Sequence, residues 1–341
     1  MVGTVVVSSA NARSGVEFTD PGLETAISAA LDLVEQRLYA AVASSDPFVQ
    51  EAARHLVDAG GKRFRPMLVT LGGQFGDPTD ARLVDAAAVM ELTHLATLYH
   101  DDVMDEAHVR RGAPSANARW GNSLAILVGD YLFAQAADIA AELGTEAVRL
   151  QARTFARLVH GQIAETIGPR DSDPIEHHLT VLAEKTGSLI ATSARIGAMM
   201  AGAPEHAIEA LTEYGEMIGI AFQLSDDLLD IASDSLQSGK TPGTDLREGV
   251  PTLPVLYALA DDEPSLEAVR LREILAAGPV TDDDLHAEAL ALLRDSAALK
   301  RARQTVRDYA DQAAEALSGL PDIAARRALA SLCHAIVDRT S

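Results

Sequence analysis

Two aspartate-rich segments carry the residues whose types and spacing are best suited to chemistry. The first reads DDVMD from Asp101 to Asp105, and the second reads DDLLD from Asp226 to Asp230. The first and last aspartates of each segment are four residues apart, so on a helix their carboxylates project from one face, a turn apart. Such a pair can hold a cation, and two such clusters suggest one shared site.

The surroundings of these carboxylates predict a magnesium-dependent reaction of a diphosphate. Both segments lie among apolar residues, where clustered carboxylates without a cation would repel one another. Oxygen ligands select a hard cation, and Mg²⁺ usually takes one or two carboxylates together with waters and substrate phosphate oxygens. A metal-bound diphosphate leaves readily, and an allylic carbon can bear the positive charge that its departure creates.

A second set of groups is suited to a diphosphate held without metal. Two glycines at Gly60 and Gly61 precede Lys62 and Arg65, so the backbone can approach an anion while the side chains supply charge; the alternative is a basic helix end. His94 and Arg111 flank the first aspartate segment, although a lone histidine in an apolar run is more often a buried core residue. Two bound diphosphates predict a condensation.

Helical periodicity accounts for almost the whole chain, with no convincing strand, so the expected fold is all-α. Helices are expected from residue 21, over 47–59, from about 81 to the first aspartate segment, and over 122–144, 146–167, 175–200, 205–232, 253–260, 265–277, 281–295, 297–318 and 322–339. Lys185-Thr186-Gly187 interrupts one of them and predicts a kink that aims Lys185 and Thr186 inward. Residues 233–252 lack periodicity and predict a lid or binding loop that carries Lys240.

Composition limits the class of protein. The 341 residues contain no Pro/Ser-rich or charged linker, which predicts a flexible terminus over 1–20 and a single domain over 21–341. A net charge of −22 argues against nucleic-acid binding. Cys333 is the only cysteine, which excludes an intrachain disulfide and fits the cytoplasm. The N-terminus lacks the features of a signal peptide, and no continuous apolar run of membrane-spanning length is expected.

Five motifs in order resemble the trans-isoprenyl diphosphate (polyprenyl) synthases, most closely the bacterial long-chain enzymes. The motifs are GGKRFRP, HDDVMDEAHVRRG, KTG, FQLSDDLLD and GKTPGTDLREG. The resemblance implies a large helical bundle of the isoprenoid synthase type around a central apolar cavity. It implies a Mg²⁺-dependent prenyltransferase that condenses isopentenyl diphosphate head-to-tail onto an allylic diphosphate, and a homodimer.

The resemblance also implies a role for individual residues. The Mg²⁺ ligands would be Asp101, Asp105 and Asp226, supported by Asp102 and Asp230. Isopentenyl diphosphate would be held by Lys62, Arg65, His94 and Arg111. The allylic diphosphate would be held by Arg110, Lys185, Gln223 and Lys240, with Thr186 beside the reacting carbons. Asp101, Asp105, Asp226, Lys185, Thr186 and Gln223 would form the catalytic set, and the released diphosphate would take the final proton.

Some alternatives stay open. Many relatives carry lysine where this chain has Val250, so the allylic diphosphate loses one expected contact. Small residues at Ala96 and Thr97 favour a long product, but Met90 or Phe133 could close the tunnel earlier and give a geranylgeranyl or shorter product. A catalytic subunit that needs a partner chain is also open. A silent subunit, a carboxylate metal-binding bundle, a class I terpene cyclase and a head-to-head synthase are disfavoured.

Overall fold

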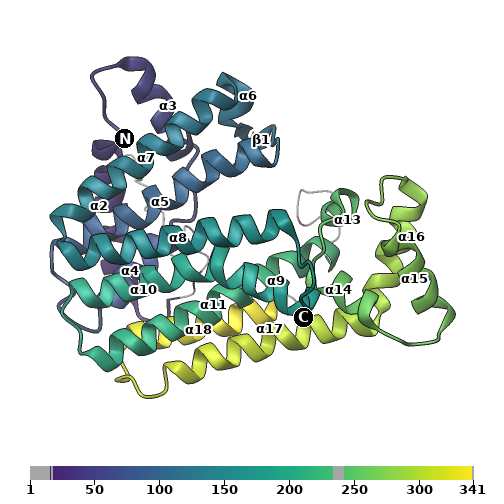
Figure 1. Ribbon diagram of the computed structural model, residues 1–341. Helices are drawn as coiled ribbons and strands as arrows, with labels where there is room; N and C mark the ends of the chain where they lie inside the picture. The colour runs from purple at the N-terminus through teal and green to yellow at the C-terminus, as the bar shows by residue number, and fades with distance from the viewer. Residues whose placement is uncertain (1–15, 17, 233–241, 340–341) are drawn as a thin grey trace, which may run out of the picture. The chain divides into compact units, whose positions relative to one another are not determined.

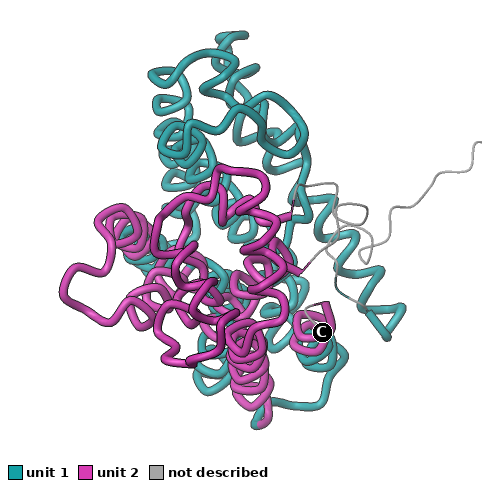
Figure 2. Tube along the Cα trace, turned by 90° about the vertical axis from the view of Figure 1, so that its right-hand side faces the viewer, with its two compact units in different colours: residues 1–156, 189–215, 319–331 teal, residues 157–188, 216–318, 332–341 magenta. Residues whose placement is uncertain are grey.

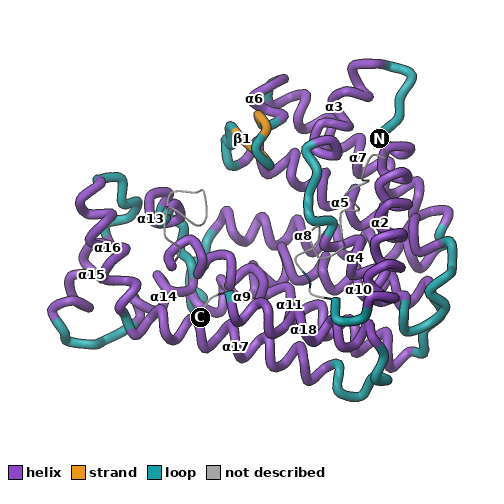
Figure 3. Tube along the Cα trace, turned by 180° about the vertical axis from the view of Figure 1, so that it is seen from behind, coloured by secondary structure: helices purple, strands orange, loops and turns teal. Residues whose placement is uncertain are grey.

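The computed structural model describes residue 16, residues 18–232 and residues 242–339, and these are almost entirely helical (Figure 1, Figure 3). In chain order the elements are α2 (Pro21–Ala41), α3 (Pro47–Asp58), α4 (Phe64–Gly73), α5 (Arg82–Met104), β1 (Val109–Arg110), β2 (Ala113–Pro114), α6 (Ala116–Trp120), α7 (Asn122–Glu142), α8 (Thr145–Ile167), α9 (Pro174–Leu182), the π-helical turn η1 (Ala183–Gly187), α10 (Ser188–Met200), α11 (Glu205–Ala232), α13 (Thr244–Glu248), α14 (Leu253–Ala260), α15 (Leu266–Ala276), α16 (Asp283–Asp295), α17 (Ala297–Ala316) and α18 (Ala324–Asp338). The prediction of an all-α fold is confirmed.

The chain divides into two compact units, coloured separately in Figure 2. Unit 1 comprises residues 1–156, 189–215 and 319–331, and unit 2 comprises residues 157–188, 216–318 and 332–341. The first aspartate segment belongs to unit 1 and the second to unit 2.

Unit 1 is built around α5. This helix packs against α2, α4, α6 and α7, and apolar side chains such as Met90, Leu92 and Leu95 are completely buried on it. Burying a side chain of this size contributes about 1.5–3 kcal/mol. The polar residues Glu91 and Asp102 are also buried on α5, and such groups need partners in the core. Those partners form the site described below.

Unit 2 packs α14 against α9, α15, α16 and α17. The second half of α11 is tied to this unit by two hydrogen bonds: Arg294 Nε donates to the Ile231 carbonyl at 2.8 Å, and Ser225 Oγ donates to the Ile336 carbonyl at 3.3 Å. The second aspartate segment therefore lies on a firmly packed stretch of helix.

Local chemistry explains where several helices begin. Asp20 caps α2 by accepting the Leu23 amide at 2.8 Å, and Pro21 follows at the first helical position, as the sequence predicts. The same aspartate–proline pair begins α3 at Asp46 and α9 at Asp173.

Three short helices, α4, α6 and α13, and the hairpin β1–β2 were not predicted. Helix α4 contains Pro66 in its first turn, where proline costs no helical hydrogen bond, and its glycines face close neighbours: a Cβ on Gly72 would lie 2.4 Å from the Ala194 carbonyl oxygen. The hairpin β1–β2 forms because Arg111 and Gly112 both have positive φ, which suits a tight two-residue turn. Helix α6 begins at a Ser115 cap.

The expected loop over 233–252 contains α13, which begins and ends at glycines with positive φ, Gly243 and Gly249. Lys240 lies outside the described residues.

Helix α7 departs from the expectation about membranes. Among the described residues it is the one helix long and apolar enough to cross a membrane by length and composition. It packs along α5, and a core helix of a soluble protein meets the same criterion.

Candidate active site

The first aspartate segment lies at the end of α5. The helix ends at Met104, and the Asp105 amide still donates to the Asp101 carbonyl at 2.8 Å, so the four-residue spacing is helical. Asp105 is exposed and Asp101 is partly exposed, whereas Asp102 is completely buried. The segment therefore offers two carboxylates that solvent reaches, Asp101 and Asp105, and one that is buried, Asp102.

Asp102 anchors the hairpin. Arg110 Nε donates to Asp102 Oδ1 at 2.6 Å, and the Asp102 carbonyl accepts from Asn117 Nδ2 at 2.9 Å. Burial raises the pKa of Asp102, while the hydrogen bond from Arg110 opposes that shift. Asp102 Oδ2 is buried without a hydrogen-bond partner among the described residues. The aspartate thus fixes Arg110 of the hairpin against the C-terminal end of α5.

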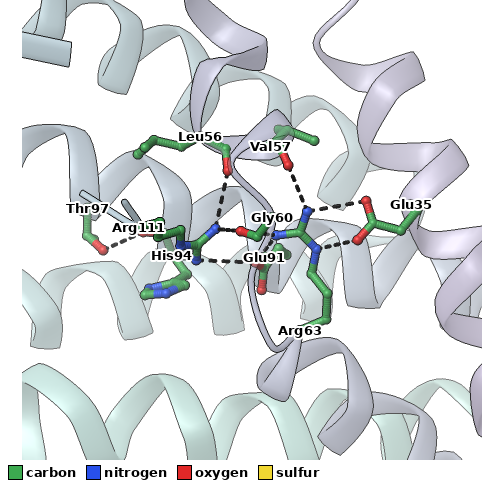
Figure 4. Close-up of polar contacts among 9 residues, drawn as sticks. All are labelled: Glu35, Leu56, Val57, Gly60, Arg63, Glu91, His94, Thr97 and Arg111. Carbon is green, nitrogen blue, oxygen red and sulfur yellow. Dashed lines mark hydrogen bonds and ion pairs between the residues drawn. The ribbon is translucent and has the colours of Figure 1, made fainter. Parts of the chain in front are cut away.

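A cluster of basic residues lies beside α5 (Figure 4). Arg111 Nη1 donates to the carbonyls of Leu56, at 3.2 Å, and Gly60. A Cβ on Gly61 would lie 2.9 Å from the Arg111 guanidinium carbon, so the absence of a side chain at Gly61 allows Arg111 to approach the loop. Gly61 therefore permits the close approach of an arginine, and Gly60 supplies a carbonyl that this arginine contacts.

Arg65 and His94 complete this cluster. Burial, reinforced by the charge of Arg111, lowers the pKa of Arg65 to about 10, and the buried Arg65 Nε has no hydrogen-bond partner among the described residues. Burial and the neighbouring arginines Arg65 and Arg111 hold the pKa of His94 well below its usual value. His94 is therefore a neutral hydrogen-bonding group near neutral pH, and the cationic charge comes from the arginines.

Sequence reasoning assigned no role to Arg63, which holds this loop in place. Arg63 has a left-handed backbone with φ of 50° and is buried. Its guanidinium donates to Glu35 Oε1 at 2.5 Å and to Glu91 Oε1 at 2.9 Å (Figure 4). Burial alone would lower the pKa of Arg63, but hydrogen bonds and charges from these two glutamates raise it. We call Glu35, Arg63 and Glu91 the loop anchor.

His94 gives a prediction for the pH dependence of stability. Its folded-state pKa is lowered, so the unfolded chain binds a proton near the ordinary pKa of 6.5 while the folded chain does not, and stability is lost as the pH falls below that value. We expect the free energy of unfolding in urea to decrease more between about pH 7 and about pH 5 in the wild type than in His94→Gln. Equal decreases in the two proteins would contradict a neutral His94 in the folded chain.

The second aspartate segment lies on α11. Asp227 is mostly buried, and burial raises its pKa to about 7. Gln223 Nε2 donates to Asp227 Oδ1 at 3.2 Å, and Thr186 Oγ1 contacts Gln223 Oε1 at 3.5 Å. Burial lowers the pKa of His178, whose Nε2 is 3.9 Å from Asp227 Oδ2, to about 4, so we regard this contact as a neutral one. The structure therefore brings together Thr186, Gln223 and the second aspartate segment.

The outer aspartates of this segment differ in their surroundings. Asp226 is 45% exposed and forms an ion pair with Arg339, whose guanidinium lies 5.0 Å from the centre of the Phe222 ring. Asp230 Oδ2 accepts from the Asp245 amide at 3.1 Å, which ties the start of α13 to α11. Asp230 is thus partly used in holding the loop.

Lys185 lies on η1. The interruption of the helix is a π-helical turn, and its Lys185 Nζ forms an ion pair with Glu165 Oε2 at 2.5 Å. The interruption of the helix at these residues is therefore a widened turn, and the inward aim of Lys185 and Thr186 stays a prediction.

The aspartates fit a metal that takes few protein ligands. In the part of the chain that the structure describes, no three acidic, histidine or cysteine side chains are grouped closely enough to hold a metal ion. Each segment instead offers a pair of carboxylates, which matches the preference of Mg²⁺ for one or two carboxylates, waters and phosphate oxygens. That the two segments form one site stays a prediction.

Comparisons with known proteins agree with these features. A family model described as polyprenyl synthetase matches residues 46–293. The chain is 51% identical over 328 residues to a nonaprenyl diphosphate synthase of Mycobacterium tuberculosis, covering 96% of this chain and 97% of that protein. It is 40% identical over 305 residues to the heptaprenyl diphosphate synthase component 2 of Geobacillus stearothermophilus, covering 89% and 93%. A crystal structure of a geranylgeranyl pyrophosphate synthase from Corynebacterium glutamicum, complexed with calcium and isoprenyl diphosphate, is 48% identical with a TM-score of 0.87, covering 95% and 99%.

Proposed function

This chain belongs to the polyprenyl synthetase family and is a prenyltransferase, and on that premise we propose that it condenses isopentenyl diphosphate head-to-tail onto an allylic diphosphate to make a long all-trans polyprenyl diphosphate. The observation that carries the proposal is that the family match over residues 46–293 contains both aspartate segments, each on a helix with carboxylates four residues apart. The match runs through residues of both units, which supports one isoprenoid synthase domain over 21–341.

We propose Mg²⁺ as the cofactor, with Asp101, Asp105 and Asp226 as ligands and Asp102 and Asp230 in support. The metal would stabilise the charge of the departing diphosphate. Asp102 holds Arg110 at the C-terminal end of α5, and Asp230 holds the start of α13. The calcium named with a relative's structure is also a hard divalent cation, which supports an oxygen-ligated site.

The basic cluster of unit 1 would bind isopentenyl diphosphate through Lys62, Arg65, His94 and Arg111. The buried Arg65 Nε has no partner among the described residues, and a diphosphate oxygen would supply one. Arg111 is held by backbone carbonyls, so its guanidinium is oriented before the anion arrives. His94 would contribute a hydrogen bond without charge.

The allylic diphosphate would be held by Arg110, Lys185, Gln223 and Lys240, with Thr186 beside the reacting carbons. Arg110 is oriented by Asp102, and Thr186 contacts Gln223. Val250 supplies no charge where many relatives carry lysine.

We propose a long product because the residues that precede the first aspartate segment are small. Ala96 is buried and Thr97 is partly buried on α5, and the nonaprenyl relative supports the same conclusion. A geranylgeranyl product is the alternative, supported by the relative of known structure and by Phe133, whose ring lies 4.1 Å from that of Phe155. Both the small residues Ala96 and Thr97 and the adjacent rings of Phe133 and Phe155 would border a growing apolar chain.

We also propose a cytoplasmic homodimer. Helix α7 exposes Ile126 at 43% and Leu127 at 60%, an apolar surface that a second copy would cover. The relative named as a component supports the alternative of a two-chain enzyme. Sedimentation velocity of the purified chain should give the mass of a dimer, and a monomer that dimerises only with another chain would favour the alternative.

The proposed function is tested with the purified chain alone. The chain is incubated with Mg²⁺, isopentenyl diphosphate and either farnesyl or geranylgeranyl diphosphate, and the dephosphorylated products are sized by chromatography. We expect products longer than twenty carbons that disappear when a chelator removes the metal and return when Mg²⁺ is restored. A product that stops at twenty carbons would support the geranylgeranyl alternative. No product from a folded, metal-loaded chain would contradict a stand-alone enzyme.

A further inference from the structure

The π-helical turn η1 is an unusual backbone that needs support from its surroundings. Its five residues, Ala183–Gly187, widen the helix, and the Ser188 amide donates to the Ala183 carbonyl, five residues earlier. Turns of this kind are rare and occur often at functional sites. Lys185 and Thr186 both lie on η1, so whatever holds the turn also sets the direction of these side chains.

Arg157 of α8 holds η1 against α11. Its Nε and Nη2 atoms both donate to Glu184 Oε1, at 3.0 Å and 2.9 Å. Its Nη1 donates to Glu216 Oε1 at 2.5 Å, and Nη2 donates to Glu216 Oε2 at 3.2 Å. These hydrogen bonds, that with Glu216 foremost, raise the pKa of Arg157. One planar guanidinium thus joins three segments of unit 2, a geometry that lysine cannot reproduce.

Two more residues of α8 contact η1 at four-residue intervals after Arg157. A Cβ on Gly161 would lie 2.8 Å from the Lys185 amide nitrogen and 3.0 Å from Glu184 Cβ. Glu165 Oε2 then pairs with Lys185 Nζ at 2.5 Å. Because residues four apart share a helix face, Arg157, Gly161 and Glu165 form a stripe along η1. We call these three residues the α8 clamp.

We propose that the α8 clamp positions Lys185 and Thr186 and thereby determines the affinity for the allylic diphosphate. Arg157 and Gly161 would be positioning residues. Among the described residues, Arg157 reaches η1 through the carboxylate of Glu184, and Gly161 lies against the η1 backbone and Glu184 Cβ. The inference rests on the proposed function, in which Lys185 and Thr186 face the allylic substrate. The basic cluster that would bind isopentenyl diphosphate lies in the other unit.

The test compares Arg157→Met with Arg153→Met. Arg153 is an exposed residue of α8 one turn earlier. Its substitution removes the same charge but keeps the contacts of the α8 clamp with η1. In steady-state assays with geranylgeranyl diphosphate and isopentenyl diphosphate, Arg157→Met should raise KM for the allylic substrate by about tenfold, which corresponds to the loss of one positioned ionic contact, and leave KM for isopentenyl diphosphate within about twofold. Arg153→Met should change neither constant by more than about twofold.

A second variant and a direct binding measurement keep the test independent of folding and of turnover. Gly161→Ala keeps every charge but places a methyl group too close to the Lys185 amide nitrogen. It should therefore also raise KM for the allylic substrate and not KM for isopentenyl diphosphate. Calorimetry with an unreactive allylic thiodiphosphate should show the same loss of affinity, and hydrogen exchange at amides 183–188 should be faster in Arg157→Met, with the circular dichroism spectrum unchanged.

Equal changes in both KM values, or no change in either variant, would overturn the clamp. That result is distinguishable from failure of the proposed function, in which the wild type itself would neither elongate an allylic diphosphate nor bind the thiodiphosphate.

Discussion

Replacing Asp101 by asparagine should lower kcat by about a thousandfold, which corresponds to about 4 kcal/mol of transition-state stabilisation. Asparagine keeps the size of the side chain and one oxygen but removes the negative charge. Since Asp101 and Asp105 would share one cation, losing either carboxylate leaves the first segment with a single anionic ligand. The measurement is the rate of incorporation of labelled isopentenyl diphosphate at saturating substrate and Mg²⁺.

The matched control is Glu106→Gln. Glu106 is an exposed carboxylate directly after the segment, so its substitution makes the same change in net charge at nearly the same place. We expect its kcat to stay within about twofold of the wild type. If Glu106→Gln lost as much activity as Asp101→Asn, general electrostatics would explain the effect and the ligand role of Asp101 would be wrong.

Replacing Arg63 by methionine should lower the free energy of unfolding by about 3–5 kcal/mol, because it leaves Glu91 buried without its closest cationic partner. The side chains of Arg63 and Glu91 are 3% and 2% exposed, so water cannot replace the lost contact. The loop anchor also holds a left-handed backbone that would relax toward a less strained conformation. Urea unfolding followed by circular dichroism measures the change.

Two further variants distinguish the effect of breaking the buried Arg63–Glu91 ion pair from the effect of removing any arginine. Arg149→Met breaks the exposed ion pair with Glu146 and should cost no more than about 1 kcal/mol. The double variant Arg63→Met, Glu91→Met removes both charges and should be more stable than Arg63→Met alone. A double variant less stable than Arg63→Met would show that the loss comes from packing, and the assignment of Arg63 and Glu91 as a buried pair would be wrong.

Elements that depend on neighbouring residues were predictable from the sequence. The start of α2 follows from Asp20 and Pro21, since the cap and the fixed φ act over a few residues. Helix α4 was not predictable in this way, because its proline and glycines normally break helices and are tolerated here through contacts with distant parts of the chain, such as Ala194.

In the candidate site, too, features set by neighbouring residues were predictable and features set by distant contacts were not. The spacing of Asp101 and Asp105 is a local property and was predicted. The roles of Arg63 and Arg157 depend on carboxylates far away in the sequence, at Glu35, Glu91 and Glu216, so no local pattern indicates them. The neutral state of His94 likewise follows from burial beside Arg65 and Arg111, which only the folded chain brings together.

The approach of Arg111 to Gly61 has a consequence for the evolution of this enzyme. The two positions are fifty residues apart in the chain, but any side chain at 61 must displace the guanidinium of 111. The effects of substitutions at these two positions should therefore not add: once Gly61 is replaced, the contact of Arg111 with the loop is already lost, and replacing Arg111 should cause little further loss of activity. In a library of variants the two sites would behave as one heritable unit, and recombination between related sequences would have to exchange them together.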